Sequence, residues 1–146
     1  MMTLLLGPPR VATGCDPRTA PLSFLIEGRE LRLVASPWLN LMPIPVKPLD
    51  KHAPFRANVT ILAVDSLPLS RSVLIDSVWV AAGQHTWGGR LEGASRSADS
   101  SRLMRVVWGA PPWLLQADSV DVAARVRTGK RIACLRAPRA HLVRAE

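Results

Sequence analysis

The chain has 146 residues, a length typical of one domain, with 13 prolines and a formal net charge of +8. An apolar fraction of 48% and a charged fraction of 21% exclude an intrinsically disordered chain. Because proline lacks a backbone N–H and disrupts helix interiors, this proline content excludes a protein built from long helices. No run approaches the roughly 20 apolar residues that cross a bilayer, so we expect no transmembrane segment.

The basic residues are unusual in kind. Only three of the 19 are lysine (Lys47, Lys51 and Lys130), and the others are arginine. Arginine binds phosphate and carboxylate bidentately, so a polyanionic partner is one interpretation. A codon bias that replaces lysine with arginine is the other, and composition by itself favours it.

Residues 1–20 contain a Gly-Pro-Pro break and no apolar periodicity, which is typical of a tail or a degenerate signal segment. Ala12-Thr13-Gly14-Cys15 is similar to a bacterial lipobox, although Ala12 stands where leucine is usual and the apolar stretch before it is missing. That similarity predicts lipidation of Cys15, and an extracytoplasmic or lipid-anchored protein if the start codon is mis-annotated. Otherwise we expect a cytoplasmic protein.

Cys15 and Cys134 are the two cysteines of the chain, and their separation matches no metal-ligand spacing. Cys134 lies within an alternating apolar pattern, where a free cysteine is usually a small core residue. A Cys15–Cys134 disulfide is the alternative, provided that the N-terminal segment docks on that strand.

Residues 21–146 alternate short apolar runs with turn residues, the pattern of a β-sandwich or barrel. In chain order we expect strands at Leu22–Ile26, Leu31–Ala35, Phe55–Asp65, Val73–Ala82, Thr86–Glu92 and Leu103–Trp108. The five prolines of Pro37–Pro54 make that segment a long connection. In Phe55–Asp65 every second residue from Phe55 to Ala63 is apolar, which predicts one buried face.

A final hairpin is expected between Val120 and Ala137. A two-residue turn at Thr128-Gly129 predicts the pairs Arg127 with Lys130, Val122 with Leu135, Ala124 with Ala133, and Asp121 with Arg136. This register keeps the apolar faces of both strands together, and a slip of one residue would set Val122 against Arg136.

The strand spacing favours an all-β fold, an antiparallel β-sandwich of about seven to nine short strands of the immunoglobulin-like kind. Three short stretches carry a resemblance to a known group of proteins: Gly28-Arg29-Glu30-Leu31 with Pro37-Trp38, Asp76-Ser77-Val78-Trp79-Val80, and Val120-Asp121-Val122. Through them, residues 22–144 resemble small bacterial immunoglobulin-like or fibronectin-like sandwich proteins of unknown function. The resemblance implies an extracytoplasmic binding or accessory domain and no particular chemistry.

The hairpin carries the strongest basic cluster. Four cations, Arg125, Arg127, Lys130 and Arg136, are expected to project from one of its faces. They could bind the phosphates of a nucleic acid or an acidic membrane surface. The alternative is a solvated strand face whose charge prevents edge-to-edge aggregation.

Five tryptophans are candidates for contact with a ligand. Trp79 lies in an apolar strand and is expected in the core. Trp38 and Trp113 follow prolines on expected loops, where tryptophan can anchor a partner or ligand. The alternative is that both rings plug the open ends of the sandwich.

Catalytic and metal motifs are missing from the sequence. His52, His85 and His141 are not at metal-ligand spacing, and the Asn58-Val59-Thr60 glycosylation sequon falls within a strand, which favours a chance match. We therefore expect a non-enzymatic binding or accessory domain without a cofactor, whose partner is an unknown protein or ligand. The alternative function is an anion-binding module that uses the basic hairpin.

Overall fold

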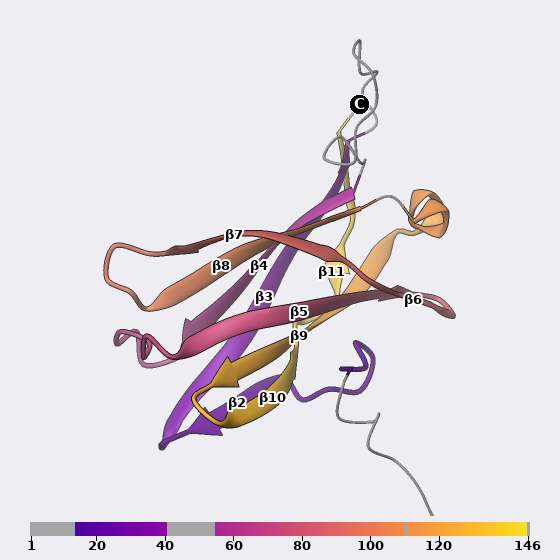
Figure 1. Cartoon of the computed structure of the whole chain (residues 1–146). Helices are drawn as coiled ribbons and strands as arrows, with labels where there is room; N and C mark the ends of the chain where they lie inside the picture. Colours follow the sequence, from indigo (N-terminus) through magenta and orange to yellow (C-terminus); the bar gives the residue numbers. More distant parts are fainter. Residues whose placement is uncertain (1–13, 41–54, 110, 146) are drawn as a thin grey trace, which may run out of the picture.

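The computed structural model describes residues 14–40, 55–109 and 111–145, and most of these residues lie in β-strands (Figure 1). Two sheets, of six and five strands, pack face to face. The predicted all-β antiparallel sandwich is therefore confirmed, with more strands in the described ranges than the sequence indicated. The expected tail up to Thr13, and the expected connection from Leu41 to Pro54 with His52, lie outside the described residues.

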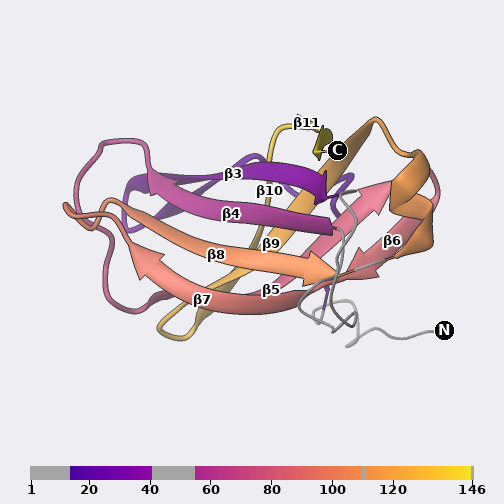
Figure 2. The same cartoon turned by 90° about the horizontal axis from the view of Figure 1, so that it is seen from above.

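The six-stranded sheet has the order β12-β3-β4-β8-β7, and β2 also pairs with β3. Its strands are β2 (Ser23–Ile26), β3 (Arg29–Asn40), β4 (Phe55–Ala63), β7 (Arg90–Arg96), β8 (Arg102–Gly109) and β12 (Val143–Ala145). All its pairs are antiparallel except β12 with β3. Figure 2 looks onto the outer face of this sheet, with the other sheet behind it.

The five-stranded sheet has the order β10-β9-β5-β6, and β11 pairs with β9. Its strands are β5 (Val73–Ala82), β6 (His85–Gly88), β9 (Ser119–Thr128), β10 (Arg131–Arg136) and β11 (Ala140–His141). A short 3-10 helix, η3 (Pro112–Gln116), lies between β8 and β9 in the chain. Among the described residues no helix has the length and apolar character needed to cross a membrane.

The core lies between the two sheets and is built from alternate residues of each strand. In β4, the five residues predicted to share a face are all buried: Phe55, Ala57, Val59, Ile61 and Ala63. The opposite sheet contributes Val78 and Val80 of β5 and Val122, Ala124 and Val126 of β9. Period-two burial of β-branched and aromatic residues is the pattern that stabilises two packed sheets.

The expected connection Pro37–Pro54 is wrong at its beginning, because β3 continues through Pro37 to Asn40. Pro37 pairs with Ala57 of β4. On the opposite edge of β3, β2 pairs only as far as Arg32 and β12 begins at Trp38. Proline cannot donate a backbone hydrogen bond, and here its position has a strand partner on one side only, where proline is tolerated.

The expected strand Thr86–Glu92 is also wrong, because the chain changes sheets within it. Residues as far as Gly88 belong to β6, whereas residues from Arg90 belong to β7 of the other sheet. At Gly89 a Cβ atom would overlap the Val107 side chain, so only glycine fits this crossing. The sequence pattern of apolar alternation cannot reveal such a change of sheet.

The hairpin has the predicted faces but the wrong turn. Its turn residues are Gly129 and Lys130, so Ala124 pairs with Leu135 and Val126 with Ala133. Because the register differs from the prediction by two residues, the same side chains still face the core. Gly129 has a φ of 59° and stands first in the turn, the place that a type II′ turn gives to glycine.

The shifted register also removes the predicted Asp121–Arg136 pair. Arg136 lies opposite Ala123. The buried Asp121 carboxylate instead accepts two hydrogen bonds from Arg139, both of 3.1 Å. This bidentate pair supplies the buried carboxylate with a charged partner.

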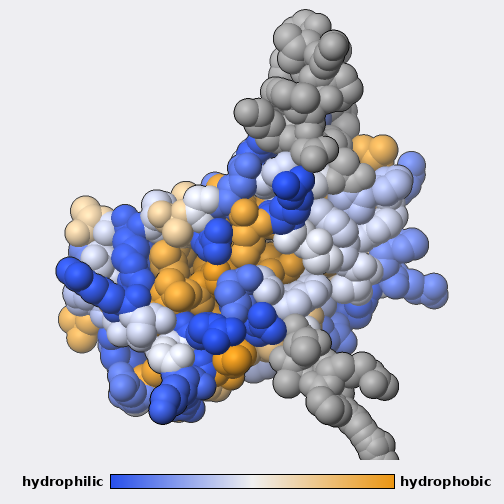
Figure 3. Space-filling model, viewed as in Figure 1, coloured by the Kyte–Doolittle hydropathy of each residue, from blue (hydrophilic) through white to orange (hydrophobic). Residues whose placement is uncertain are grey.

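On one side of the sandwich, β7 is the edge of its sheet, and the first part of β5, before its pairing with β6 begins at Trp79, is the edge of the other. Apolar residues gather between them, flanked by hydrophilic ones (Figure 3). Arginine side chains from the six-stranded sheet cross this side to β5. Arg105 Nη1 donates to the Ile75 carbonyl at 2.9 Å, and Arg96 Nη2 donates to the Val73 carbonyl at 2.9 Å. The two arginines thus bind carbonyls of an edge strand and connect the sheets.

Candidate functional site

A row of alternating tryptophan and arginine crosses the outer face of the six-stranded sheet. Trp38 of β3 pairs with Arg56 of β4, Arg56 pairs with Trp108 of β8, and Trp108 pairs with Arg90 of β7. Directly paired residues of adjacent strands point to the same face, so these four side chains lie side by side. We call them the Trp–Arg row, and Figure 2 shows its four strands in this order.

Contacts within the row are electrostatic as well as apolar. The Arg90 guanidinium lies over the Trp108 ring, 4.8 Å from its centroid, which is a cation–π distance. Arg56 forms an ion pair with Glu92 at 3.9 Å. Trp108 is 5% exposed and its Nε1 atom has no hydrogen-bond partner, whereas Trp38 is half-buried. A buried N–H without an acceptor costs about 1–3 kcal/mol.

The rest of this outer face mixes apolar and polar side chains at its centre and is basic at the end opposite the row. Val106 lies next to the row beside Asn58 and Ser36, and Met104 and Val34, which is 44% exposed, follow on either side of Thr60. Beyond them Arg32 pairs with Glu30 at 3.0 Å, and the exposed Arg102 has no ion pair within the described residues. The face therefore combines tryptophan, methionine and arginine with few carboxylates.

Beside Trp38 the surface is hollowed. The hollow has a volume of about 480 Å³ and is lined by Ala35, Ser36, Pro37, Trp38, Ala140, His141 and Val143. It lies along the stretch of β3 between its pairings with β2 and β12. Val143 of β12, the strand partner of Trp38, is 55% exposed. A partner side chain could therefore enter next to the Trp38 ring.

The two predicted tryptophan anchors differ in their surroundings. Trp38 lies on a strand and not on the expected loop, but its ring is on an outer face. Trp113 lies in η3, packs against the main core and stacks on His85 with ring centroids 5.1 Å apart. Trp113 therefore closes one end of the sandwich, the alternative that the sequence left open. The expectation for Trp79 is wrong, because its ring lies outside the core between the sheets and packs, partly buried, on the outer face of β5 against Cys15, Ala20 and Ala123.

The four predicted anion-binding residues do not form an open patch. Arg125 and Arg127 both bind Asp76 of β5, at 2.8 and 3.2 Å. Burial raises the pKa of the Asp76 carboxyl, but the hydrogen bonds from both arginines outweigh this effect, so its pKa lies below the ordinary value. Arg136 donates to the Ala20 carbonyl at 3.0 Å, and Lys130 is exposed in the turn.

Cys15, the predicted lipidation site, forms a disulfide with Cys134 of β10. The N-terminal segment therefore docks on this strand, which is the condition stated for the bond. The Cys15 side chain is 5% exposed. A sulfur atom in a disulfide cannot also carry a thioether, so lipidation of Cys15 would require a different state of this sulfur.

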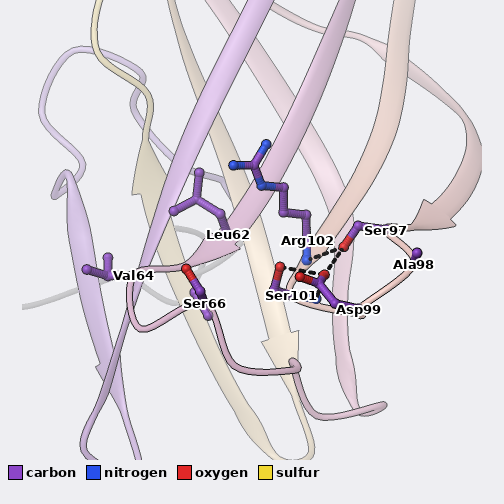
Figure 4. Close-up of a pocket in the computed structure, with 9 residues that line it drawn as sticks. Leu62, Val64, Ser66, Ser97, Ala98, Asp99, Ser101 and Arg102 are labelled. Carbon is purple, nitrogen blue, oxygen red and sulfur yellow. Dashed lines mark hydrogen bonds between the residues drawn. The ribbon is translucent and has the colours of Figure 1, made fainter.

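A second hollow, of about 500 Å³, lies at the end of the sandwich near the β7–β8 turn (Figure 4). Its acidic residue is Asp99, whose carboxylate accepts hydrogen bonds from the Ser101 N–H and hydroxyl and from the Ser97 hydroxyl. These bonds lower the Asp99 pKa to about 2. All three bonds reach Oδ1 from the Asp99 loop itself, so this oxygen holds the turn in shape.

Within the described ranges no group of histidine, cysteine, aspartate and glutamate residues could hold a metal ion. A scan against protein-family models and searches of curated proteins and of solved structures found no match to this chain. The resemblance to immunoglobulin-like sandwich proteins therefore remains an expectation from the sequence.

The Trp–Arg row was missed in the sequence apart from Trp38. Its other members are separated by up to 70 positions from Trp38 to Trp108, and they meet only through the register of four strands. The local sequence could have indicated only that Arg56 and Trp108 face outward, because each follows a buried residue in its strand, β4 or β8.

Proposed function

We propose that this chain is a non-enzymatic binding domain that holds a carboxylate-bearing protein surface against the outer face of its six-stranded sheet. The observation that carries the proposal is the Trp–Arg row. Tryptophan and arginine are the residue types that contribute most to the affinity of protein interfaces, because they combine a large contact area with directed polar groups. Trp38 would contact the partner through its ring, and Arg90 through its guanidinium.

The composition of the whole face supports a protein partner. Aromatic residues, methionine and arginine are enriched at the centre of protein interfaces, while lysine and glutamate are depleted. Here Trp38, Met104 and Val106 stand among arginines, and the face has no lysine within the described strands. The chain's net charge of +8 would steer an acidic partner towards it.

A nucleic acid fits this face less well than a protein. Glu30 and Glu92 stand among its arginines and are paired with Arg32 and Arg56. Arg32 and Arg56 therefore already have carboxylate partners and do not add to a continuous run of phosphate-binding cations. The ring of Trp108 is covered, so it offers no surface for base stacking.

The proposal is tested by titrating the isotope-labelled protein with poly-L-glutamate as a carboxylate-bearing polypeptide, and following backbone and indole N–H signals by NMR. The indole signals of Trp38 and Trp108 are expected to shift, and that of Trp79 is not. Replacing Arg90 by glutamate should weaken binding about tenfold, because it removes one cation and adds a repulsive charge. Trp38→Ala should weaken it by a similar factor.

The matched control is Arg71→Glu, which changes the net charge equally on an exposed loop residue between β4 and β5. If both charge reversals weaken binding equally, the attraction is non-specific and the proposal is wrong. Parallel titrations use a DNA duplex and vesicles of an anionic phospholipid. Tighter binding of either, with shifts centred on Arg127 and Lys130, would favour the anion-binding hairpin instead.

A further inference from the structure

Residues 14–22, here called the N-terminal strap, cross the outer face of the five-stranded sheet (Figure 1). The Arg136 N–H donates to the Pro21 carbonyl at 2.7 Å. Midway between the two attachments to β10, Cys15 and Pro21, Arg18 donates to the Gly83 and His85 carbonyls, each at 2.8 Å. The strap thus spans from the β5–β6 turn to β10, and the Cys15–Cys134 disulfide is its covalent attachment.

The two sulfur atoms of this disulfide differ in exposure. Cys15 is 5% exposed, and its Sγ lies in a buried contact 3.8 Å from the Ala124 carbonyl oxygen. Cys134 is only partly buried, at the edge of the small cluster formed by Cys15, Ala20 and Ala123. A thiolate from solution therefore has access to the Cys134 sulfur.

The surroundings of Cys134 are positively charged. Arg125 lies directly opposite Cys134 on β9, and Arg136 follows two positions along the same face of β10. Arg127 is the next residue on this face of β9, with 46% of its side chain exposed. Asp76 pairs with both Arg125 and Arg127, and Asp16 of the strap pairs with Arg18 at 3.8 Å. Cations therefore outnumber carboxylates around this sulfur.

We propose that Cys134 is a site of thiol–disulfide exchange selective for small anionic thiols. The attacking thiolate forms a bond to Cys134 Sγ, and the Cys15–Cys134 bond breaks. The electron pair of that bond leaves on Cys15 as a thiolate, so one disulfide is exchanged for another with no net oxidation or reduction. The anionic group of the incoming thiol is then held near Arg125, Arg127 and Arg136.

This exchange would also change the outer face of the five-stranded sheet, which the strap covers. The strap loses its covalent attachment and keeps its hydrogen bonds to Arg136, to the β5–β6 turn and to Thr86, together with the packing of Ala20. Gly14 packs against the Trp79 ring, so a displaced strap uncovers that ring. The strap and its disulfide therefore act as a cover whose release depends on the charge of the thiol that arrives.

The test compares three thiols of similar size, mercaptoethanesulfonate, mercaptoethanol and cysteamine, with the oxidised full-length protein. Intact-mass and peptide mass spectrometry give the rate and the position of the adduct, with each rate divided by the thiolate concentration. The sulfonate is expected to react about fivefold faster than the neutral thiol, because one nearby cation–anion interaction is worth about 1 kcal/mol. The amine should be the slowest, and added salt should reduce the differences.

Arg136→Gln removes one cation and a strap contact, so it is expected to raise all three rates but lower the ratio of the sulfonate rate to the neutral rate. Arg127→Gln lowers the same ratio without touching the strap. The matched control, Arg102→Gln on the other sheet, should leave the ratio unchanged. Equal rates for the three thiols, an adduct on Cys15 instead of Cys134, or no adduct on the folded protein would each overturn the proposal.

Discussion

At the scale of single residues, Trp87 shows how glycine makes room for a ring in this core. The Trp87 ring packs edge-on against Phe55, with centroids 5.8 Å apart. A Cβ atom at Gly109, at the end of β8, would overlap the Trp87 ring. Glycine is therefore needed at this position for space and not for its backbone freedom.

The prediction is that Gly109→Ala destabilises the fold by about 1–3 kcal/mol, the usual cost of overpacking a core. Urea unfolding with Trp fluorescence would measure it. The control is Gly88→Ala, whose Cβ would lie 3.5 Å from Trp79 in ordinary contact, and which should change stability by less than about 0.5 kcal/mol. Equal effects of the two changes would contradict this account of Trp87.

Arg29 and Asp65 illustrate an electrostatic effect at the same scale. The guanidinium donates to both Asp65 oxygens at 3.0 Å and to the Leu67 and Pro68 carbonyls. The hydrogen bond from Arg29, together with the Leu67 N–H, lowers the Asp65 pKa from 3.8 to about 2. Since the pKa is lower in the folded state, the interaction stabilises the fold above pH 4 and is lost as the pH falls towards 2.

We therefore predict that Arg29→Gln raises the Asp65 pKa, without restoring its ordinary value because the Leu67 N–H remains. An NMR titration of the Asp65 side-chain carboxyl carbon would measure the shift. Asp99, whose pKa of about 2 has a separate local cause, serves as the internal control and should not move. A pKa of Asp65 that stays near 2 in the variant would show that Arg29 is not its main cause.

At the scale of elements, apolar alternation predicts faces better than it predicts partners. The buried faces of β4 and β9 follow from period-two patterns in the sequence, whereas in β5 an irregularity between Ile75 and Ser77 shifts the alternation by one residue. The position of the β9–β10 turn does not follow from such a pattern. Moving the turn by one residue leaves the same side chains facing the core but changes every residue pair between the two strands. The change of sheet at Gly89 depends on where the second sheet lies. The continuation of β3 through Pro37 depends on which side of β3 has a partner strand at that position. That information is tertiary and is absent from a local pattern.

Arg105 connects two elements, because its side chain on β8 donates a hydrogen bond to the backbone of β5. It lies opposite the buried Val59, on the inner face of the sheet, and donates to Ile75 of β5 and to Gly93 at 2.7 Å. An arginine on an inner face has no explanation from the pattern of β8 alone. Its position follows from the free carbonyls of β5, which β9 does not reach on this side.

Arg105→Met should therefore destabilise the fold by about 1–3 kcal/mol, because an apolar chain of similar length leaves two carbonyls without their donor. Chemical denaturation gives the value, and light scattering reports whether the unprotected β5 edge self-associates. Arg102→Met is the control on the same strand, facing outward, with an expected change within about 0.5 kcal/mol. The role assigned to Arg105 is wrong if the control has the larger effect.

At the scale of the whole molecule, the sequence anticipated the sandwich and one member of the proposed site, Trp38. It could not anticipate the Trp–Arg row, because the pairings that align Trp38, Arg56 and Trp108 join distant strands. Likewise, Arg125 and Arg127 share one carboxylate, Asp76, which belongs to a strand far away in the chain. The charges of a surface could be counted from the sequence, but their partners could not.

The disulfide joins distant parts of the chain, with a sequence separation of 119 residues and Cα atoms 5.6 Å apart. Such a link mainly restricts the unfolded chain, and a loop of this size is expected to stabilise the fold by about 4–5 kcal/mol. We predict that the double variant Cys15→Ser with Cys134→Ser still folds, since a chain of this length buries enough apolar surface without a crosslink. Its urea midpoint should be markedly lower, whereas reducing the variant with dithiothreitol should change nothing. An unchanged midpoint would show that the strap docks without help from the bond, and an unfolded variant would show that the two sheets depend on it.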